Sequence, residues 1–431
     1  MTQIFIRQCR EFLGQEVTIR GWLVHKRSSG QVRFAVLRDG TGILQALLIK
    51  SRVAPAVLEV FDQLTQETSF SLTGVLHEDP RAPGGVELEV SSLALFQTAQ
   101  DYPISPKEHG VAFLMENRHL WLRTARQQAV LRIRHELVRA ARDFLDNHHF
   151  ILLDAPILTP AACEGTSNLF ATPYFDQGQA YLSQSGQLYM EAGAMAFSRV
   201  YCFGPAFRAE KSKTRRHLTE FWMVEPEIAF ADLEELVFWS EQLVSSMVTR
   251  VLASRSEELK LLERDPAALE KVTPPFPRLS YQEALDVLSD RGMTLAFGED
   301  LGGDEETQIS LQFEKPVFIH RYPAASKAFY MKRDPEDPRL VLNMDLLAPE
   351  GYGEIIGGSE READLFRLQE RIRENGLSEE DLKWYLDLRR YGSVPHGGFG
   401  LGLERLVTWV CGLKHVRETI PFPRTLYRLY P

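Results

Sequence analysis

The sequence predicts two domains: a small all-β barrel at the N-terminus and a larger α+β domain whose mainly antiparallel sheet is flanked by helices. Short strand-like runs separated by turn residues fill residues 15–100, whereas the rest of the chain mixes long helical patterns with isolated short strands. A length of 431 residues, 44% of them apolar, supplies enough core for both domains. We expect the first domain to span residues 1–100, a stiff Pro-containing linker to span 101–123, and the second domain to span 124–431.

The first domain contains five strand-like runs and one helix. The segments between the runs are rich in Gly, Ser and Asp, which favour turns. The helical stretch Pro55–Leu64 lies between the third and fourth runs. This order is typical of an OB-fold barrel, whose strand face commonly binds single-stranded nucleic acid. The predicted strands are Val17–Val24, Val32–Leu37, Ile43–Ile49, Phe70–His77 and Val86–Phe96.

The second domain begins with a long helix. Thr124 and Gln127 have the spacing of a capping box, and apolar residues follow at helical spacing as far as His149. The strand-like segments downstream are short and mostly not joined by regular βαβ units, which favours an antiparallel sheet over a Rossmann sheet. Further helices are predicted over Asp232–Ala253, Tyr281–Asp290, Glu362–Asn375 and Ser378–Arg390, and strands around Tyr181, Val200, Met223, Val317 and Val341.

Charge is spread unevenly along the chain. The formal net charge of −10 argues against a nonspecific nucleic-acid coat. Residues 17–50, however, carry six cations and one anion, and residues 208–216 carry five cations and one anion. Local basic surfaces on an acidic body suit a polyanion that docks in one register. The sequence contains no run of eighteen apolar residues and no signal-peptide pattern at its start, so we expect a cytoplasmic protein without a membrane partner.

Three segments carry a family resemblance. Phe207–Glu210 and Gly398–Arg405 each place one arginine where a strand or a Gly-rich turn can aim it, and a guanidinium fork suits phosphate oxygens. Upstream, the long helix runs into Ile151–Pro156. In this order the segments resemble the three signature motifs of class II aminoacyl-tRNA synthetases, in the subclass of the aspartyl, lysyl and asparaginyl enzymes. The asparaginyl members are the closest match, and the resemblance extends from about residue 15 to the C-terminus.

The resemblance implies an ATP site in which a substrate carboxylate attacks the α-phosphate and pyrophosphate leaves. Such chemistry needs charge stabilisation and positioning more than a side-chain nucleophile. Arg208 and Arg405 are therefore the predicted catalytic residues. By resemblance, Arg208 holds the α-phosphate and the substrate carboxylate, Glu210 contacts the adenine amino group, His217 reaches the terminal phosphates, Phe221 stacks on the adenine, and Arg405 clamps the γ-phosphate. An ordinary core aromatic is the alternative reading of Phe221.

The resemblance also implies Mg²⁺, for which Asp345 and Glu354 are the predicted ligands. They stand on either side of the turn Ala348–Gly353 and offer the hard oxygen atoms that Mg²⁺ prefers. Aspartyl relatives often carry a serine ligand three residues after the glutamate, whereas this chain has Gly357. Without the resemblance, paired surface acids would be the better interpretation.

The predicted amino-acid pocket favours asparagine. Where an aspartyl enzyme typically presents lysine, this chain has Met190. The resemblance assigns Arg361 to the side-chain carbonyl of the substrate, and Glu191 can accept hydrogen bonds from the amide NH₂. Aspartate would set its charge against Glu191, which costs about 4 kcal/mol at 4 Å and an effective dielectric of about 20. The resemblance assigns Glu164 and Gln187 to the α-ammonium group.

Phe34 and Gln45 are the predicted anticodon readers. They lie on neighbouring strands of one hairpin, where a Phe can stack on an unpaired base and a Gln amide can read its edge. Both match family positions that recognise the middle anticodon uridine. The resemblance further implies a homodimer, formed through the segment that includes the long helix and Pro156.

The sequence thus predicts an enzyme that joins L-asparagine to tRNA(Asn) with ATP. Three alternatives remain. An aspartyl-tRNA synthetase, either discriminating or non-discriminating, is disfavoured by Met190 and Glu191. An asparagine-synthesising paralogue is disfavoured by residues 15–100. A noncatalytic RNA-binding paralogue is disfavoured by the retained Arg208, Glu210, Glu354 and Arg405.

Overall fold

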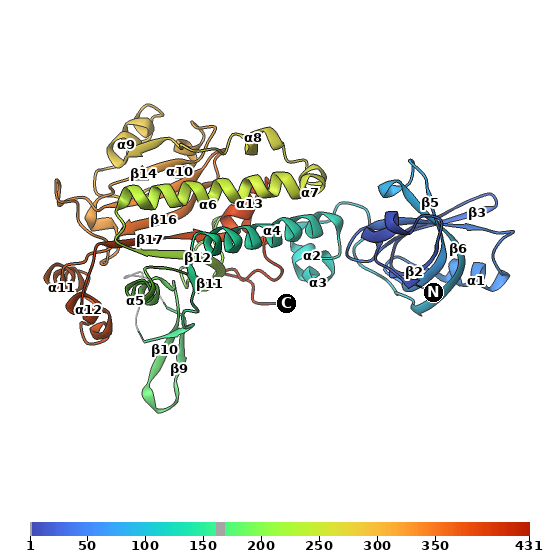
Figure 1. Cartoon of the computed structure of the whole chain (residues 1–431), viewed down its shortest axis with the longest axis horizontal. Helices are drawn as coiled ribbons and strands as arrows, with labels where there is room; N and C mark the ends of the chain where they lie inside the picture. The colour runs from blue at the N-terminus through green and yellow to red at the C-terminus, as the bar shows by residue number, and fades with distance from the viewer. Residues whose placement is uncertain (1, 161–168) are drawn as a thin grey trace. The chain divides into compact units, whose positions relative to one another are not determined.

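The computed structural model describes residues 2–160 and 169–431, and the chain divides between residues 111 and 112 into two compact units (Figure 1). The second unit includes part of the segment that the sequence assigns to the linker. Arg118 is buried there and donates from Nε and Nη2 to the carbonyl oxygens of Pro421 and Ile420, each at 2.8 Å. Among the described residues, no helix has the length and apolar content needed to cross a membrane.

The first unit is the predicted OB-fold barrel. Its strands follow the order β1-β2-β3-β4-β6-β5, and β5 also pairs with β2, which closes the barrel. Alternate residues such as Val17 and Ile19 point inward and are fully buried. The elements are β1 (Thr2–Gln3), η1 (Ile6–Phe12), β2 (Glu16–Ser29), β3 (Val32–Arg38), β4 (Ile43–Ile49), α1 (Pro55–Gln63), β5 (Ser69–Glu78), η2 (Pro83–Gly85) and β6 (Val86–Gln97).

The second unit is built on an eight-stranded sheet in the order β13-β14-β15-β16-β17-β12-β11-β7. The edge pairs β7–β11 and β13–β14 are parallel and the pairs between them are antiparallel, as the sequence predicts. A smaller sheet has the order β8-β10-β9. The strands are β7 (Ile151–Leu152), β8 (Leu158–Thr159), β9 (Ala171–Pro173), β10 (Gln179–Leu182), β11 (Arg199–Phe207), β12 (Glu220–Ala229), β13 (Arg278–Ser280), β14 (Val317–His320), β15 (Asn343–Ala348), β16 (Gly353–Glu360) and β17 (His396–Gly402).

Helices cover one face of this sheet. The two long helices α4 and α6 lie side by side across it, and together with α13 they enclose the main core (Figure 1). The helices are α2 (Val111–Glu116), α3 (Arg118–Trp121), α4 (Ala125–Asn147), α5 (Gln187–Phe197), α6 (Leu233–Ser254), α7 (Ser256–Leu261), α8 (Pro266–Glu270), α9 (Tyr281–Ser289), α10 (Gly303–Ser310), α11 (Leu365–Glu374), α12 (Lys383–Arg390) and α13 (Leu403–Val410).

Two helix starts follow from local sequence. The hydroxyl of Thr124 accepts a hydrogen bond from the Gln127 backbone N–H, and Asp232 caps α6 in the same way. The predicted capping box on α4 is only half formed. The Gln127 side chain accepts instead from Nη1 of Arg118 at 2.8 Å, because the buried guanidinium needs a partner.

Candidate active site

The site lies on the sheet face opposite α4 and α6. Side chains alternate between the two faces of a strand, so Met344 and Leu346 enter the helix-covered core while Asp345 between them points the other way. Gly400 on β17 also belongs to the open face. A Cβ atom there would come within 2.6 Å of Cε of Met223, so the close packing of β17 against this side chain requires a glycine.

Two adjoining cavities occupy the open face. The first has a volume of about 260 Å³ and the second about 340 Å³. Arg208, Met223, Glu354 and Gly400 line both. A ligand that extends through both cavities would therefore pass the Arg208 guanidinium.

The first cavity brings together all six residues that the sequence predicts for ATP. Arg405 donates from Nη1 to the Glu354 carboxylate at 2.8 Å, and the Arg208 guanidinium lies 5.6 Å from the Phe221 ring centroid. Burial and then the positive charge of Arg405 lower the pKa of His217 to about 4, so its imidazole is neutral at pH 7. The six residues are Arg208, Glu210, His217, Phe221, Glu354 and Arg405.

The two predicted metal ligands approach each other at Gly357. A Cβ atom on Gly357 would lie 3.0 Å from Oε1 of Glu354 and 3.4 Å from Oδ1 of Asp345. Burial raises the pKa of Asp345 to about 6, although the neighbouring Lys327 opposes this shift. Burial also raises the pKa of Glu354, but the charges of Arg405 and Lys327 outweigh it, so the net shift is downward. The structure therefore places two carboxylates around one open position.

Lys327 is a cation of the second cavity that the sequence analysis missed. Its Nζ lies 3.1 Å from Oδ2 of Asp345 and 3.0 Å from Oδ1 of Asp300. It follows the short 3₁₀ helix η4 (Ala324–Ser326), where the sequence has no periodic pattern that indicates a direction for the side chain. Only the fold brings it to Asp345.

Arg361 and Glu227 form the polar end of the second cavity. Nε and Nη2 of Arg361 donate to the two Glu227 oxygens, each at 2.9 Å, and Nη1 donates to the Ser359 hydroxyl at 2.8 Å. Burial raises the pKa of Glu227 despite the Arg361 charge. The sequence analysis missed Glu227, although Glu225 and Glu227 are two residues apart on β12, a spacing that aims both carboxylates at one face.

Glu191 lies behind this cavity and is not among its lining residues. Its Oε1 accepts from Nε2 of Gln187 at 2.5 Å and from the Tyr385 hydroxyl at 2.7 Å. Its Oε2 accepts from Nη2 of Arg389 at 2.7 Å and from Nε2 of His396 at 2.9 Å. The sequence predicts Glu191 as the acceptor for a substrate amide, but these four donors already occupy it, and the carboxylate facing the cavity beside Arg361 belongs to Glu227.

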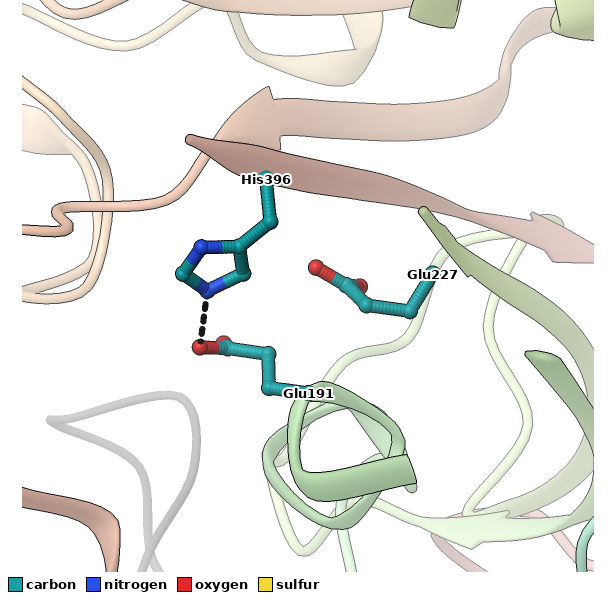
Figure 2. Close-up of side chains that lie close together, drawn as sticks. All are labelled: Glu191, Glu227 and His396. Carbon is teal, nitrogen blue, oxygen red and sulfur yellow. Dashed lines mark hydrogen bonds and ion pairs between the residues drawn. The ribbon is translucent and has the colours of Figure 1, made fainter. Parts of the chain in front are cut away.

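Figure 2 shows how these groups meet: Glu191 comes from α5, Glu227 from β12 and His396 from β17. Their ligand atoms lie within 4.8 Å of one another, which is close enough for a metal ion. The carboxylates, however, are already paired with Arg389 and Arg361. The cluster is therefore a buried ion-pair network, and it holds Gln187 and Arg361 in place at the cavity.

Of the other predicted residues, Gln187 lines the second cavity, whereas Glu164 lies outside the described residues. In the barrel, Phe34 on β3 pairs with Leu47, and Gln45 on β4 pairs with Val36, so Phe34 and Gln45 share the outer face. The Arg27 guanidinium lies 4.1 Å from the Phe34 ring centroid. Gln45 donates from Nε2 to Glu87 at 3.1 Å.

Comparison with known proteins agrees with this architecture. Residues 111–426 match the family described as tRNA synthetases class II (D, K and N), and residues 17–95 match the OB-fold nucleic acid binding domain. The fold is that of a class II aminoacyl-tRNA synthetase, and the chain belongs to this class.

Full-length relatives narrow this class. The asparagine–tRNA ligase of Desulforamulus reducens is 58% identical over 431 residues, and that of Thermus thermophilus is 56% identical over 437 residues, with 100% of both chains covered in each case. A crystal structure of asparaginyl-tRNA synthetase from Pyrococcus horikoshii complexed with asparaginyl-adenylate matches with a TM-score of 0.97 and 45% identity, covering 100% of each chain. The chain belongs to the asparaginyl-tRNA synthetase family.

Proposed function

We propose that this protein activates L-asparagine with ATP to asparaginyl-adenylate and pyrophosphate, then transfers asparagine to the 3′ end of tRNA(Asn). One observation carries the proposal: two cavities share the wall formed by Arg208. One is lined by the predicted ATP residues, and the other ends in the Arg361–Glu227 pair. The junction is where the amino-acid carboxylate and the α-phosphate would meet.

In the first step a carboxylate oxygen bonds to the α-phosphorus and the bond from that phosphorus to the pyrophosphate oxygen breaks. Arg208 at the junction stabilises the charge that develops on the phosphoryl oxygens, and Arg405 holds the leaving pyrophosphate. In the second step a ribose hydroxyl of the tRNA attacks the acyl carbon and AMP leaves. Both steps depend on positioning, so they suit guanidinium groups held by regular elements: Arg208 directly follows β11, and Arg405 lies in the first turn of α13.

The fit of Mg²⁺ rests on the carboxylates around Gly357. Asp345 and Glu354 offer oxygens on two sides of one open position, and carboxylates are hard ligands suited to this ion. These two residues would hold the ion, which when bound would neutralise phosphate charge. Glu306 interacts electrostatically with Glu354, and Asp300 with Asp345, so both acidic groups would add attraction for a cation.

Selectivity for asparagine follows from the Arg361–Glu227 pair. The guanidinium can donate to the amide oxygen of the substrate while the carboxylate accepts from its NH₂ group. Aspartate would bring a second carboxylate beside Glu227, an unfavourable like-charge contact in a buried site. Gln187, anchored by Glu191, would contact the α-ammonium group, and the same role for Glu164 remains a prediction.

The remaining partners belong to the same proposal. Phe34 and Gln45 would read an anticodon base, supported by their shared outer face on an OB-fold barrel. A homodimer is supported by an exposed apolar surface near Pro156. Ile151, Leu152, Ile157 and Leu158 are between 38% and 45% exposed there, and large apolar patches of this kind commonly mark interfaces. Location in the cytoplasm remains a prediction of the sequence.

The test is ATP–pyrophosphate exchange without tRNA, measured separately with asparagine, aspartate and lysine. We expect exchange with asparagine. Arg208→Ala should abolish it because the guanidinium that lines both cavities, where the carboxylate and the α-phosphate would meet, is removed. Exchange with aspartate at equal efficiency would assign the aspartyl alternative. An absence of exchange with all three would refute the proposed activity.

A further inference from the structure

The N-terminal barrel carries a second aromatic site that the proposed function does not use. A cavity of about 240 Å³ opens on its surface between the N-terminal residues 3–5, β2 and the end of β6. Three aromatic rings line it: Phe5, Trp22 and Phe96 are 50%, 38% and 59% exposed. A cluster of three exposed aromatic side chains around one hollow indicates a binding surface rather than core packing.

One arginine guanidinium lies near each of these three rings. The Arg20 guanidinium lies 5.9 Å from the Phe96 ring centroid, and that of Arg7 lies 5.9 Å from Phe5. The Arg38 guanidinium lies 4.9 Å from the Trp22 ring centroid. It is buried in an ion pair with Glu67, so it packs against the indole and is not available to a ligand. Arg7 and Arg20 are exposed and can meet an anion. Aromatic rings interleaved with arginines suit unpaired bases and their phosphates.

The polar groups around the cavity fit the same ligand. Gln3 and Ser69 line it and supply an amide and a hydroxyl, the kinds of group that read base edges. Asp39 is the acidic member of the lining, but its carboxylate is bound by the backbone N–H groups of Ile6, Thr41 and Gly42. Asp39 therefore holds the N-terminal segment in place.

The cavity continues the surface that carries the predicted anticodon readers. In the β2–β3 register, Trp22 pairs with Arg38 and Arg27 pairs with Phe34. Trp22 and Arg27 are exposed on this surface, and their partners on β3 are four positions apart, about 13 Å along the strand. A single stacked base is smaller than this span, so one base could not occupy both sites.

We propose that Phe5, Trp22 and Phe96 form a second base-stacking site, which takes another unpaired nucleotide of the tRNA whose anticodon base stacks on Phe34. The inference rests on the proposed function because tRNA is the ligand. Exposed cations and continuity with the Phe34 surface favour RNA over a protein partner.

The test measures the Kd of the full-length protein for a tRNA(Asn) transcript. Trp22→Ala and Phe96→Ala should each weaken binding about tenfold, the range of one lost base stack, whereas Trp22→Phe should bind nearly as well as the unchanged protein. Combining Trp22→Ala with Phe34→Ala should multiply the two losses, since separate sites contribute independently. Phe366→Ala, which removes a 77% exposed aromatic from α11, is the matched control.

Two further measurements separate this site from the proposed function and from folding. ATP–pyrophosphate exchange without tRNA should be unchanged in Trp22→Ala, Phe96→Ala and Arg20→Gln. Arg20→Gln should also reduce the slope of log Kd against log salt concentration by about one. An unchanged Kd in Trp22→Ala and Phe96→Ala would overturn the proposal. A fall in melting temperature or in exchange, without a specific loss of tRNA affinity, would assign these rings to a protein contact instead. Absence of exchange in the unchanged protein would refute the proposed function and leave the tRNA measurement to decide the second site.

Discussion

Replacing Glu227 with Gln should remove most of the preference of the amino-acid cavity for asparagine over aspartate. Both Glu227 oxygens accept from Arg361 at 2.9 Å, and the side chain is almost fully buried. A substrate carboxylate about 4 Å from Glu227 costs about 4 kcal/mol at an effective dielectric of about 20. This corresponds to roughly a thousandfold preference for asparagine over aspartate. Glu227→Gln removes that repulsion and leaves the positive charge of Arg361 to attract aspartate.

The assay is ATP–pyrophosphate exchange, with kcat/KM determined for asparagine and for aspartate. In Glu227→Gln we expect the ratio of the two values to fall by a factor of up to about a thousand. Glu191→Gln is the matched control because Glu191 is equally buried and belongs to the same ion-pair network, yet lies behind the cavity. It should lower kcat/KM for both amino acids, since it loosens Gln187, and should change their ratio much less. The reverse pattern, with selectivity lost in Glu191→Gln and kept in Glu227→Gln, would refute the reasoning and restore the direct role that the sequence predicts for Glu191.

Three other changes have defined outcomes. Phe34→Ala should raise the KM for tRNA about tenfold and leave tRNA-independent exchange intact. Loss of both tRNA charging and exchange would show that Phe34 is not confined to anticodon binding. Gly357→Ala sets a methyl group 3.0 Å from Oε1 of Glu354, so half-maximal exchange should need several times more Mg²⁺, and an unchanged titration would remove Asp345 and Glu354 as joint ligands. Burial, together with Arg417 and Arg215, lowers the pKa of His415 from 6.5 to about 4, so the unfolded chain binds more protons than the folded protein between these values. The free energy of unfolding should therefore decrease as the pH falls from 6.5 towards 4, and a urea titration of His415→Gln should show a shallower decrease.

The sequence was a good guide wherever an element or a site is built locally. Alternating apolar residues and turn signals located the barrel strands, and Asp232 marked the start of α6. The predicted ATP residues on β12 and on the loop between β11 and β12 gather around one cavity, because a hairpin brings residues close in sequence close in space. Arg405 joins them through the pairing of β17 with β12.

Sequence reasoning was weakest where partners are far apart in the chain. The donors that occupy Glu191 include Tyr385, Arg389 and His396, about 200 residues away, so no local pattern distinguishes this carboxylate from Glu227. Lys327 illustrates the same limit, because its contact with Asp345 depends on an irregular segment. Gln127 has the sequence spacing of a capping box, yet tertiary contact with Arg118 redirects its side chain.

The ion pair between Arg405 and Glu354 should couple the binding of nucleotide to the binding of metal. Without ligands, Arg405 and Glu354 neutralise each other. When ligands bind, the Arg405 guanidinium would pair with a phosphate instead, and the Glu354 carboxylate would pair with a cation. If only one ligand arrives, the other member of the pair is left as a partly buried charge without its partner, which is unfavourable. Nucleotide and metal binding should therefore show positive cooperativity, and thermodynamic linkage requires each to raise the affinity of the other by the same factor. The pair thus favours loading of ATP together with its metal over loading of either alone.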